Sequence, residues 1–219
     1  MMTTTKKTSQ VHEAYLAIEN RIVTLEFVPG SKLTERFIID SVGFGRTPVR
    51  EAIQRLMLEG LIEVHPRSGV KIVDIRPEDY PLVMEPRLSL EPLLARSAAR
   101  FGGPRDRELI AHCMHEMHTA ARRGDVRGYL RQDKALDEAL SKAAANPYLP
   151  RALAPLQTHS RRFWFHYHGT NGLVEAAAGH VAVCQEVIIG DSDAAFDKAR
   201  LLMEYLFNGS RARVVVGNG

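Results

Sequence analysis

Two arginines flank a Thr-Pro pair where the sequence predicts the start of a helix. Thr47 suits the N-cap, and Pro48 suits the first helical position because its missing N–H is not needed there. Arg46 then lies just before the helix and Arg50 in its first turn. Both add positive charge to a helix end whose free N–H groups and dipole already favour phosphate, and an arginine fork also fits a guanine edge. The pattern predicts DNA contact; the alternative is a solvated, charged helix end.

Further candidate contacts lie in a predicted β-hairpin that follows this helix. Its strands are two short apolar runs, 61–65 and 70–73, joined by a Pro-Arg-Ser-Gly turn. His65 and Arg67 flank the tight turn, which can lie beside a minor groove. Gly69 lets the backbone come close to a partner.

The elements that position these residues follow from helical periodicity and from Gly and Pro breaks. Helices are predicted at 9–25, from Thr34 to the Gly-Phe-Gly break at 43–45, and from Thr47 to the C-terminal cap Gly60. Thr34 is the expected N-cap of the second helix. Helix, helix, turn, helix and hairpin is the order of a winged helix-turn-helix.

The remainder of the chain has almost entirely helical periodicity, which predicts a helix bundle. Six helical segments are expected, near 78–100, 105–123, 126–144, 147–168, 173–189 and 192–207. Pro86 and Pro92 should kink or interrupt the first of them. The fold class is therefore mainly α, a winged helix-turn-helix followed by an all-α bundle. The predicted division is a tail at 1–9, a DNA-binding domain at 10–74, a linker at 75–80, a bundle at 81–210 and a tail at 211–219.

Composition narrows the class of protein. The chain has 219 residues, 45% hydrophobic and 25% charged, which is typical of a soluble globular protein with two domains. No apolar run is long enough to span a membrane, and the polar N-terminus is not a signal peptide, so a cytoplasmic location is expected. Cys113 and Cys184 lie outside any metal-binding spacing and are expected to be buried. The net charge of +3 neither requires nor excludes nucleic acid.

Residues from about 10 to 74 resemble the DNA-binding domain of the GntR family of bacterial regulators. The matching stretches are PGSKLTER at 29–36, RTPVREAI at 46–53 and LxxEGLI at 56–62. The resemblance implies DNA contacts by Arg36, Arg46, Thr47 and Arg50, and by the wing tip around Gly69. Glycine at position 45 replaces a usual serine or threonine and removes a hydroxyl that would contact phosphate.

The C-terminal half resembles the FadR-type effector domain of that family, called FCD, over about residues 78–208. The matching pieces are RxxLEP at 87–92, DxxxD at 133–137, ANPYL at 145–149, His180 and the Gly-Asp pair at 190–191. In many members one Asp and three His bind a divalent metal that helps hold a carboxylate effector, with an arginine of the first helix nearby. Here Asp133 and His180 match two ligands, whereas Asp137 and Leu202 stand where the family has histidines.

Two alternatives remain open for each group of this predicted effector site. Asp133 and Asp137 share a helix face, so with His180 they could hold a divalent ion such as Zn, Ni or Mn. Otherwise Asp133 and His180 form a hydrogen-bonded pair without metal, and no cofactor is certain. Arg87 is predicted to bind an acidic effector, or else to form a salt bridge within the bundle. The aromatic segment 161–168 is expected to line the pocket, a dimer interface or the core.

These residues favour a transcription repressor. A homodimer would place two recognition helices on a palindromic double-stranded operator, and a small-molecule acid would change its affinity, by release in the commoner family arrangement. One alternative is a metal-dependent enzyme fused to a winged helix, but its ligand set looks degraded. Another is a winged-helix protein–protein adaptor, which the arginines at 46 and 50 argue against.

Overall fold

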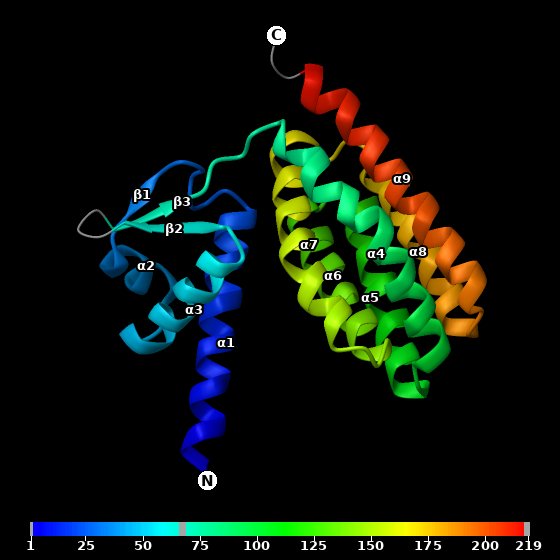
Figure 1. The fold of residues 1–219 in the computed structure, drawn as a ribbon, viewed down its shortest axis with the longest axis horizontal. Coiled ribbons are helices and arrows are strands. Elements are labelled where there is room, and N and C mark those ends of the chain that lie inside the picture. The colour runs from blue at the N-terminus through cyan, green and yellow to red at the C-terminus, as the bar shows by residue number, and fades with distance from the viewer. Residues whose placement is uncertain (1, 66–68, 217–219) are drawn as a thin grey trace. The chain divides into compact units, whose positions relative to one another are not determined.

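The computed structural model describes residues 2–65 and 69–216, with side chains over 10–65 and 69–209. The chain divides into two compact units, Met1–Arg76 and Pro77–Gly219. Figure 1 shows a small unit of helices and strands and a unit built from helices alone. The predicted fold class is therefore confirmed: an N-terminal winged helix-turn-helix precedes an all-helical bundle.

Three helices form the body of the N-terminal unit: α1 (Met2–Val23), α2 (Glu35–Val42) and α3 (Arg46–Leu58). The Oγ1 atom of Thr34 accepts a hydrogen bond from the N–H of Phe37, which confirms Thr34 as the N-cap of α2. Apolar faces of all three helices meet in one core. Its fully buried members include Ala14, Ile18, Ile22, Ile38, Val49, Ala52 and Leu56.

A carboxylate fixes α3 against α1 beside this core. Glu59, the C-cap of α3, accepts a hydrogen bond of 2.7 Å from the Tyr15 hydroxyl of α1 and one of 2.9 Å from Nε of Arg55. The Arg55 guanidinium also lies 3.8 Å from the centre of the Tyr15 ring. The orientation of α3 is thus set at its C-terminal end, which leaves the N-terminal end available for a partner.

The start of α3 differs from the prediction. The helix begins at Arg46 and its N-cap is Gly45, which offers no side-chain hydrogen bond, so Thr47 is not the cap. Glycine is an accepted N-cap, and the helical turn closes through the N–H of Val49 on the carbonyl of Gly45. The exposed Thr47 hydroxyl therefore takes no part in capping.

The wing is a sheet of strands in the order β1-β3-β2, all antiparallel. The hairpin β2 (Ile62–His65) and β3 (Gly69–Ile72) confirms the predicted strands, while its turn at 66–68 lies outside the described residues. Strand β1 (Lys32–Leu33) was not predicted. Two residues are too short to show an alternating pattern, and only pairing with β3 makes them a strand.

All six predicted helices of the second unit are present in the described residues. They are α4 (Asp79–Phe101), α5 (Pro104–Arg122), α6 (Val126–Ala143), α7 (Tyr148–Tyr167), α8 (Leu173–Ile189) and α9 (Ser192–Val216). Pro86 and Pro92 do not interrupt α4, contrary to one of the two expectations. Burial on α4 explains this, because Met84, Leu94 and Ala98 pack in the core on both sides of the prolines.

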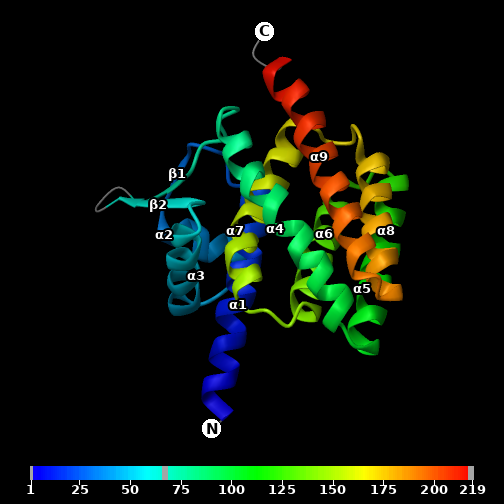
Figure 2. The ribbon, with the colours of Figure 1, turned by 45° about the vertical axis from the view of Figure 1, so that its right-hand side comes forward.

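Helix α4 occupies the middle of the bundle. It packs against α6, α7, α8 and α9, and α9 lies along both α4 and α8, as both ribbon views show (Figures 1 and 2). Side chains of α4, α6, α7 and α8 therefore face a common interior. This arrangement brings residues that are far apart in the sequence within reach of one another.

Helices extend into both segments that the sequence predicts as tails. Helix α1 begins at Met2 and α9 continues to Val216. The segment 3–8 has no apolar stripe, but no Gly or Pro stops a helix that has already nucleated. In α9, Gly209 weakens the helix by only about 1 kcal/mol relative to alanine, which does not end it.

Candidate functional site

The predicted DNA contacts gather at the N-terminal ends of α2 and α3. Arg46 and Arg50 project from the first turns of α3, and their Nε atoms lie 3.4 and 2.7 Å from the carboxylate of Glu35 at the start of α2. Their side chains are 70% and 58% exposed. One carboxylate therefore holds two arginines side by side at a helix end that already favours anions.

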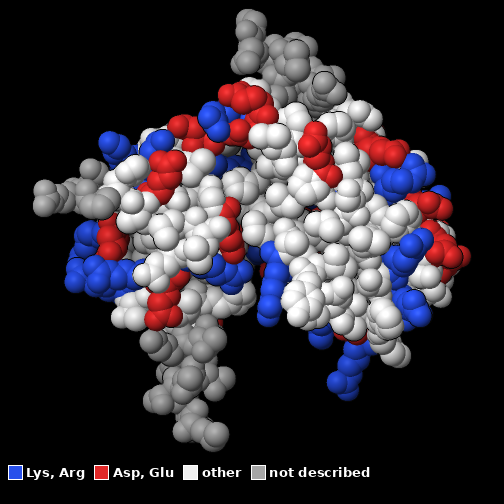
Figure 3. All heavy atoms as spheres, viewed as in Figure 1, with Lys and Arg blue, Asp and Glu red and all other residues white. Residues whose placement is uncertain are grey.

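Arg36 and Thr47 complete this exposed group, which we call the basic helix end (Arg36, Arg46, Thr47 and Arg50). Nε of Arg36 donates to Asp40 at 2.8 Å on the surface of α2. Exposed ion pairs of this kind contribute about 0–1 kcal/mol, so phosphate can replace their carboxylates at little cost. Figure 3 shows basic side chains next to acidic ones over the N-terminal unit.

The wing gives a different result for each predicted residue. His65 is exposed, and its Nε2 lies 3.2 Å from Glu63. Gly69 has a φ of +89°, and a Cβ there would lie 2.6 Å from the carbonyl oxygen of Leu33. Contact between β3 and β1 therefore already requires this glycine. Arg67 lies outside the described residues.

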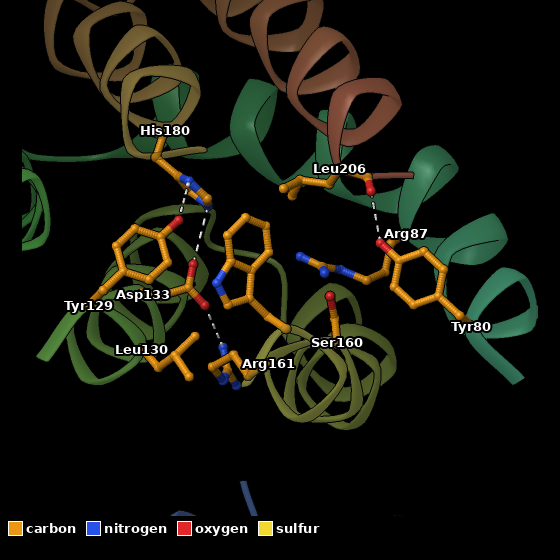
Figure 4. Close-up of a pocket in the computed structure, with 10 residues that line it drawn as sticks. Tyr80, Arg87, Tyr129, Leu130, Asp133, Ser160, Arg161, His180 and Leu206 are labelled. Atoms are coloured by element: carbon orange, nitrogen blue, oxygen red, sulfur yellow. Dashed lines mark hydrogen bonds and ion pairs between the residues drawn. The ribbon is translucent and has the colours of Figure 1, made fainter. Parts of the chain in front are cut away.

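A small polar cavity lies inside the bundle and contains most of the predicted effector residues. Its volume is about 30 Å³, which is the share of a single water molecule in the liquid. Arg87 of α4, Asp133 of α6 and His180 of α8 point into the same space (Figure 4). The other lining residues are Tyr80, Tyr129, Leu130, Ser160, Arg161, Trp164 and Leu206.

Asp133 and Asp137 lie on one face of α6, as their spacing predicted, and both are paired with an arginine of α7. Nη1 of Arg161 lies 3.2 Å from Oδ2 of Asp133 and 2.6 Å from Oδ2 of Asp137. Nη2 of Arg161 donates to the Thr158 hydroxyl at 3.2 Å. All three charged side chains are largely buried. The guanidinium is thus the cation that faces the two carboxylates.

His180 makes hydrogen bonds through both of its ring nitrogens. Nδ1 lies 2.9 Å from the carbonyl oxygen of Ala176, which can only accept, so Nδ1 carries a hydrogen. Nε2 lies 3.2 Å from Oδ1 of Asp133. Burial acts to lower the pKa of His180, but the hydrogen bond and charge of Asp133 outweigh it and raise the pKa. Acceptor oxygens thus face both nitrogens, which favours the charged form of the ring.

The two aspartates have opposite titration behaviour although both are buried. Burial acts to raise the pKa of Asp133, but His180 and Arg161 outweigh it and hold the pKa well below its usual range. Burial and the charge of Asp133 raise the pKa of Asp137, and Arg161 only partly offsets them. The surroundings thus favour the charged form of Asp133 and disfavour the charged form of Asp137.

Arg87 forms the intradomain salt bridge that was one of its two predicted roles. Its Nε and Nη2 each lie 2.9 Å from Oε1 of Glu91, and both side chains are less than 10% exposed. Its Nη1 is 3.8 Å from the thioether sulfur of Met84, and the Ser160 hydroxyl lies 3.7 Å from the same sulfur. Since a thioether is a weak acceptor, two good donors lining the cavity share a poor partner.

A second cavity of about 30 Å³ lies on the other side of Arg87 and His180. Apart from these two residues, Glu91 and Asp137, its walls are almost entirely apolar. They are formed by Leu94, Ala95, Leu136, Leu140, Val183, Cys184, Ala199, Leu202 and Met203. The charged residues thus separate a polar cavity from an apolar one.

The donor atoms do not fit a divalent metal. The described residues contain no group of three or more His, Cys, Asp or Glu side chains arranged to hold a metal ion. Asp133, Asp137 and His180 are close together, but Arg161 already bonds to both carboxylates, and Nε2 of His180 is engaged by Asp133. Leu202, where the resemblance places a histidine, is buried and apolar.

Sequence reasoning missed the central cation of this site. Arg161 belongs to the segment 161–168, for which three roles stayed open, and the structure places Arg161 and Trp164 at the cavity. Phe163 of the same segment is core. The local signal was weak, since an arginine beside aromatic residues also fits an interface. Only the packing of α7 on α6 shows which arginine reaches the aspartates.

Comparison with known proteins agrees with both halves. Residues 10–72 match the model of bacterial regulatory proteins of the gntR family, and residues 82–205 match the FCD domain. The chain belongs to this family of regulators. The membership that the sequence motifs indicated is therefore confirmed, and with it a role in transcription regulation through DNA, not catalysis.

Several proteins are similar to much of this chain. An HTH-type transcriptional regulator of Agrobacterium vitis, in the TAR-I ttuE-ttuC′ intergenic region, is 34% identical over 62% of this chain and 81% of its own length. The Escherichia coli regulator YieP is 25% identical over 85% of this chain and 89% of its own. The solved structure of E. coli McbR/YncC superimposes with a TM-score of 0.77 at 15% identity, covering 96% of this chain and 99% of that one. This last likeness concerns the fold alone.

Within residues 2–65 and 69–216, no helix of this GntR-family regulator combines the length and the apolar character that a membrane span needs.

Proposed function

We propose that this regulator is a homodimeric repressor that binds a palindromic operator through the basic helix end, and that a small carboxylate in the polar cavity changes its affinity. The observation that carries the effector is the pair of donors beside Met84. Among the described residues, Nη1 of Arg87 and the hydroxyl of Ser160 share the thioether of Met84, and a carboxylate would accept from both.

The size of the cavity supports a conformational response. At about 30 Å³ the cavity is small, so we expect an acid of several carbon atoms to displace some of the side chains that line it. Differential binding to two arrangements of the bundle is what couples an effector to DNA. A coupling of about 1–3 kcal/mol would change operator affinity roughly 5- to 150-fold.

On DNA, the two halves of a dimer would set α3 helices in successive major grooves, with half-sites about 34 Å apart. Arg46 and Arg50 would exchange Glu35 for phosphate or a guanine edge. The free Thr47 hydroxyl supports the same role, because capping by Gly45 leaves it available for a phosphate.

The DNA half of the proposal is tested by fragment enrichment. Purified protein is incubated with sheared DNA from its source genome, and the bound fragments are sequenced. We expect one short palindrome to be enriched, and the variant Arg46→Ala/Arg50→Ala to lose about 100-fold or more in affinity for it. Arg122→Ala/Arg123→Ala, which removes two exposed arginines at the end of α5, is the matched control. Enrichment that survives in the first variant would refute the assignment.

The effector half is tested with the only tryptophan of the chain, Trp164, which lines the cavity. Acetate, lactate, succinate and citrate are titrated while tryptophan emission and operator affinity are followed. We expect at least one acid to change both, and Arg87→Gln to abolish the change, whereas Arg100→Gln, exposed on the same helix, retains it. If these acids alter neither quantity, the carboxylate is wrong while the DNA assignment stands.

A further inference from the structure

The position of Arg161 leads to an inference that does not depend on which effector binds. The FCD resemblance implies a divalent cation among one aspartate and three histidines. In this chain Asp133, Asp137 and His180 surround the equivalent place, and Nη1 of Arg161 lies within 3.2 Å of a carboxylate oxygen of both aspartates. We propose that Arg161 supplies the positive charge that a metal ion would otherwise supply, and that this effector domain is built to work without metal.

The lone pairs of the remaining donors support this assignment. A histidine binds metal through an unprotonated nitrogen. Here Nδ1 of His180 donates to the carbonyl of Ala176, and Nε2 faces Oδ1 of Asp133 at 3.2 Å. Each oxygen of Asp133 thus has a cationic partner, His180 on one side and Arg161 on the other. An incoming ion would have to break these bonds before it gained its own.

The fourth ligand position is closed by packing. Leu202 of α9 is only 5% exposed, and it lies so close to α8 that a Cβ on Gly179 would be 2.7 Å from its Cδ1. An isobutyl group offers no electrons to a metal. The Leu202 side chain also lines the apolar cavity. A leucine at this position therefore both removes a metal ligand and adds apolar surface to that cavity.

The charges around the site also leave no place for a divalent ion. The carboxylates of Glu91, Asp133 and Asp137 provide at most three negative charges, and Arg87, Arg161 and His180 provide up to three positive ones. A further double charge would be buried without compensation, which is strongly unfavourable. An arginine cannot be deprotonated or removed by a chelator, so the site keeps its cation whatever metals the surroundings contain.

The first experiment measures metal in the wild-type chain. The tag-free protein is incubated with excess Zn²⁺, Ni²⁺ or Mn²⁺, desalted, and analysed by inductively coupled plasma mass spectrometry and by thermal melting. We expect well below one metal per chain and a shift in Tm smaller than about 1 °C with either metal or chelator. One tightly held metal per chain whose removal lowers Tm would overturn the proposal.

The second experiment tests whether Arg161 is what excludes the metal. The variant Asp137→His/Leu202→His restores the histidines of the family pattern but keeps Arg161, and a matched variant adds Arg161→Met. We expect about one Zn²⁺ or Ni²⁺ per chain only in the variant that also lacks Arg161. Equal metal binding by both variants would show that Arg161 does not occupy the place of the ion.

A single substitution covers the case in which the combined variant fails to fold. Arg161→Met leaves Asp137 without its hydrogen-bonded arginine and Asp133 with His180 alone, and we expect Tm to fall by roughly 5–15 °C. Added Mn²⁺ or Zn²⁺ should restore part of this loss, and should restore none in Arg161→Met/Asp133→Asn. Arg151→Met, exposed on the same helix, controls for loss of an arginine. A loss of stability that no divalent ion relieves would mean that Arg161 has only a packing role.

Discussion

In the N-terminal unit, Arg46 and Arg50 reach Glu35 from an exposed helix end, whereas in the bundle Arg87 and Arg161 reach their carboxylates inside the core. The side chains of the first pair are 70% and 58% exposed, and those of the second pair 7% and 6%. The distances are similar, so the geometry of the pairs does not distinguish them. Their surroundings do.

The difference in solvation separates exchangeable partners from fixed ones. Water screens an exposed pair, which contributes about 0–1 kcal/mol, so Glu35 can give up its arginines to a phosphate. A buried pair that loses one member leaves an uncompensated charge, which costs about 3–5 kcal/mol. In the proposed function, the same chemical pair would therefore serve as a replaceable contact at the DNA-binding surface and as a fixed part of the effector site.

The largest expected effect comes from breaking a buried pair. Arg87→Met leaves Glu91 buried with only Gln157, 3.2 Å away, as a described partner, and we expect the free energy of unfolding to fall by about 3–5 kcal/mol. The exposed counterpart Arg50→Met should change it by less than about 1 kcal/mol. Urea denaturation followed by the emission of Trp164 measures the bundle, and circular dichroism follows both units.

Removing both members of the buried pair sharpens this comparison. Arg87→Met/Glu91→Leu should recover most of the lost stability, because neither member of this pair is then left buried without its partner. If Arg87→Met proves as harmless as Arg50→Met, the core does not hold these residues in the way that the distances imply.

An intermediate effect is expected from pH, and it should be confined to the bundle. Burial and the charge of Asp133 raise the pKa of Asp137 to about 7. Burial acts to lower the pKa of His180, but the hydrogen bond and charge of Asp133 outweigh it, so this pKa is raised as well. Both groups bind protons more tightly folded than unfolded. The contribution of Asp137 to stability is therefore present below about pH 4 and is lost as pH rises to about 7, and that of His180 is lost as pH rises above about 6.5.

The variant Asp137→Asn isolates the aspartate part of this dependence. Its carboxamide oxygen can still accept from Arg161, but it does not titrate, so Tm should fall less steeply with pH and lie roughly 3–8 °C above wild type at pH 8. Thermal melts from pH 5 to pH 8 provide the measurement. Glu138→Gln, on the exposed face of the same helix, should follow the wild-type curve. Identical slopes in Asp137→Asn and wild type would assign the dependence to other groups.

The two regions also differ in how far their sequence predicted them. The helix-turn-helix is marked by local signals, namely the cap Thr34, the breaks at 43–45 and Gly60. The three helices predicted from these signals are confirmed. The predicted start of α3 was misplaced because its N-cap is a glycine, Gly45, whereas Thr47 two residues later is a residue type that commonly caps helices. Local chemistry sets these positions, and local chemistry is what a sequence displays.

The cavity depends on packing between helices, which leaves little local trace. Asp133, Asp137, His180 and Arg87 were found because their spacing resembles a known family, and the structure brings them together. Arg161 has no fixed spacing from the aspartates, and its role appears only when α7 lies against α6. The donors beside Met84 were missed for the same reason, since nothing in the sequence shows that Ser160 and Arg87 share one sulfur atom.

The smallest expected effect lies at the exposed pair itself. Glu35→Gln removes the negative charge beside Arg46 and Arg50, and the loss of repulsion toward phosphate should raise affinity for random duplex DNA about 2- to 5-fold, with stability changed by less than about 0.5 kcal/mol. Fluorescence anisotropy over a range of salt concentrations measures this, with Glu108→Gln, exposed on α5, as the control for net charge. If Glu35 also orients the two arginines for base contacts, its removal should raise affinity for the operator less than affinity for random DNA. The ratio of the two affinities should then decrease. Weaker binding to random DNA would instead show that holding Arg46 and Arg50 in place matters more than the charge that holds them.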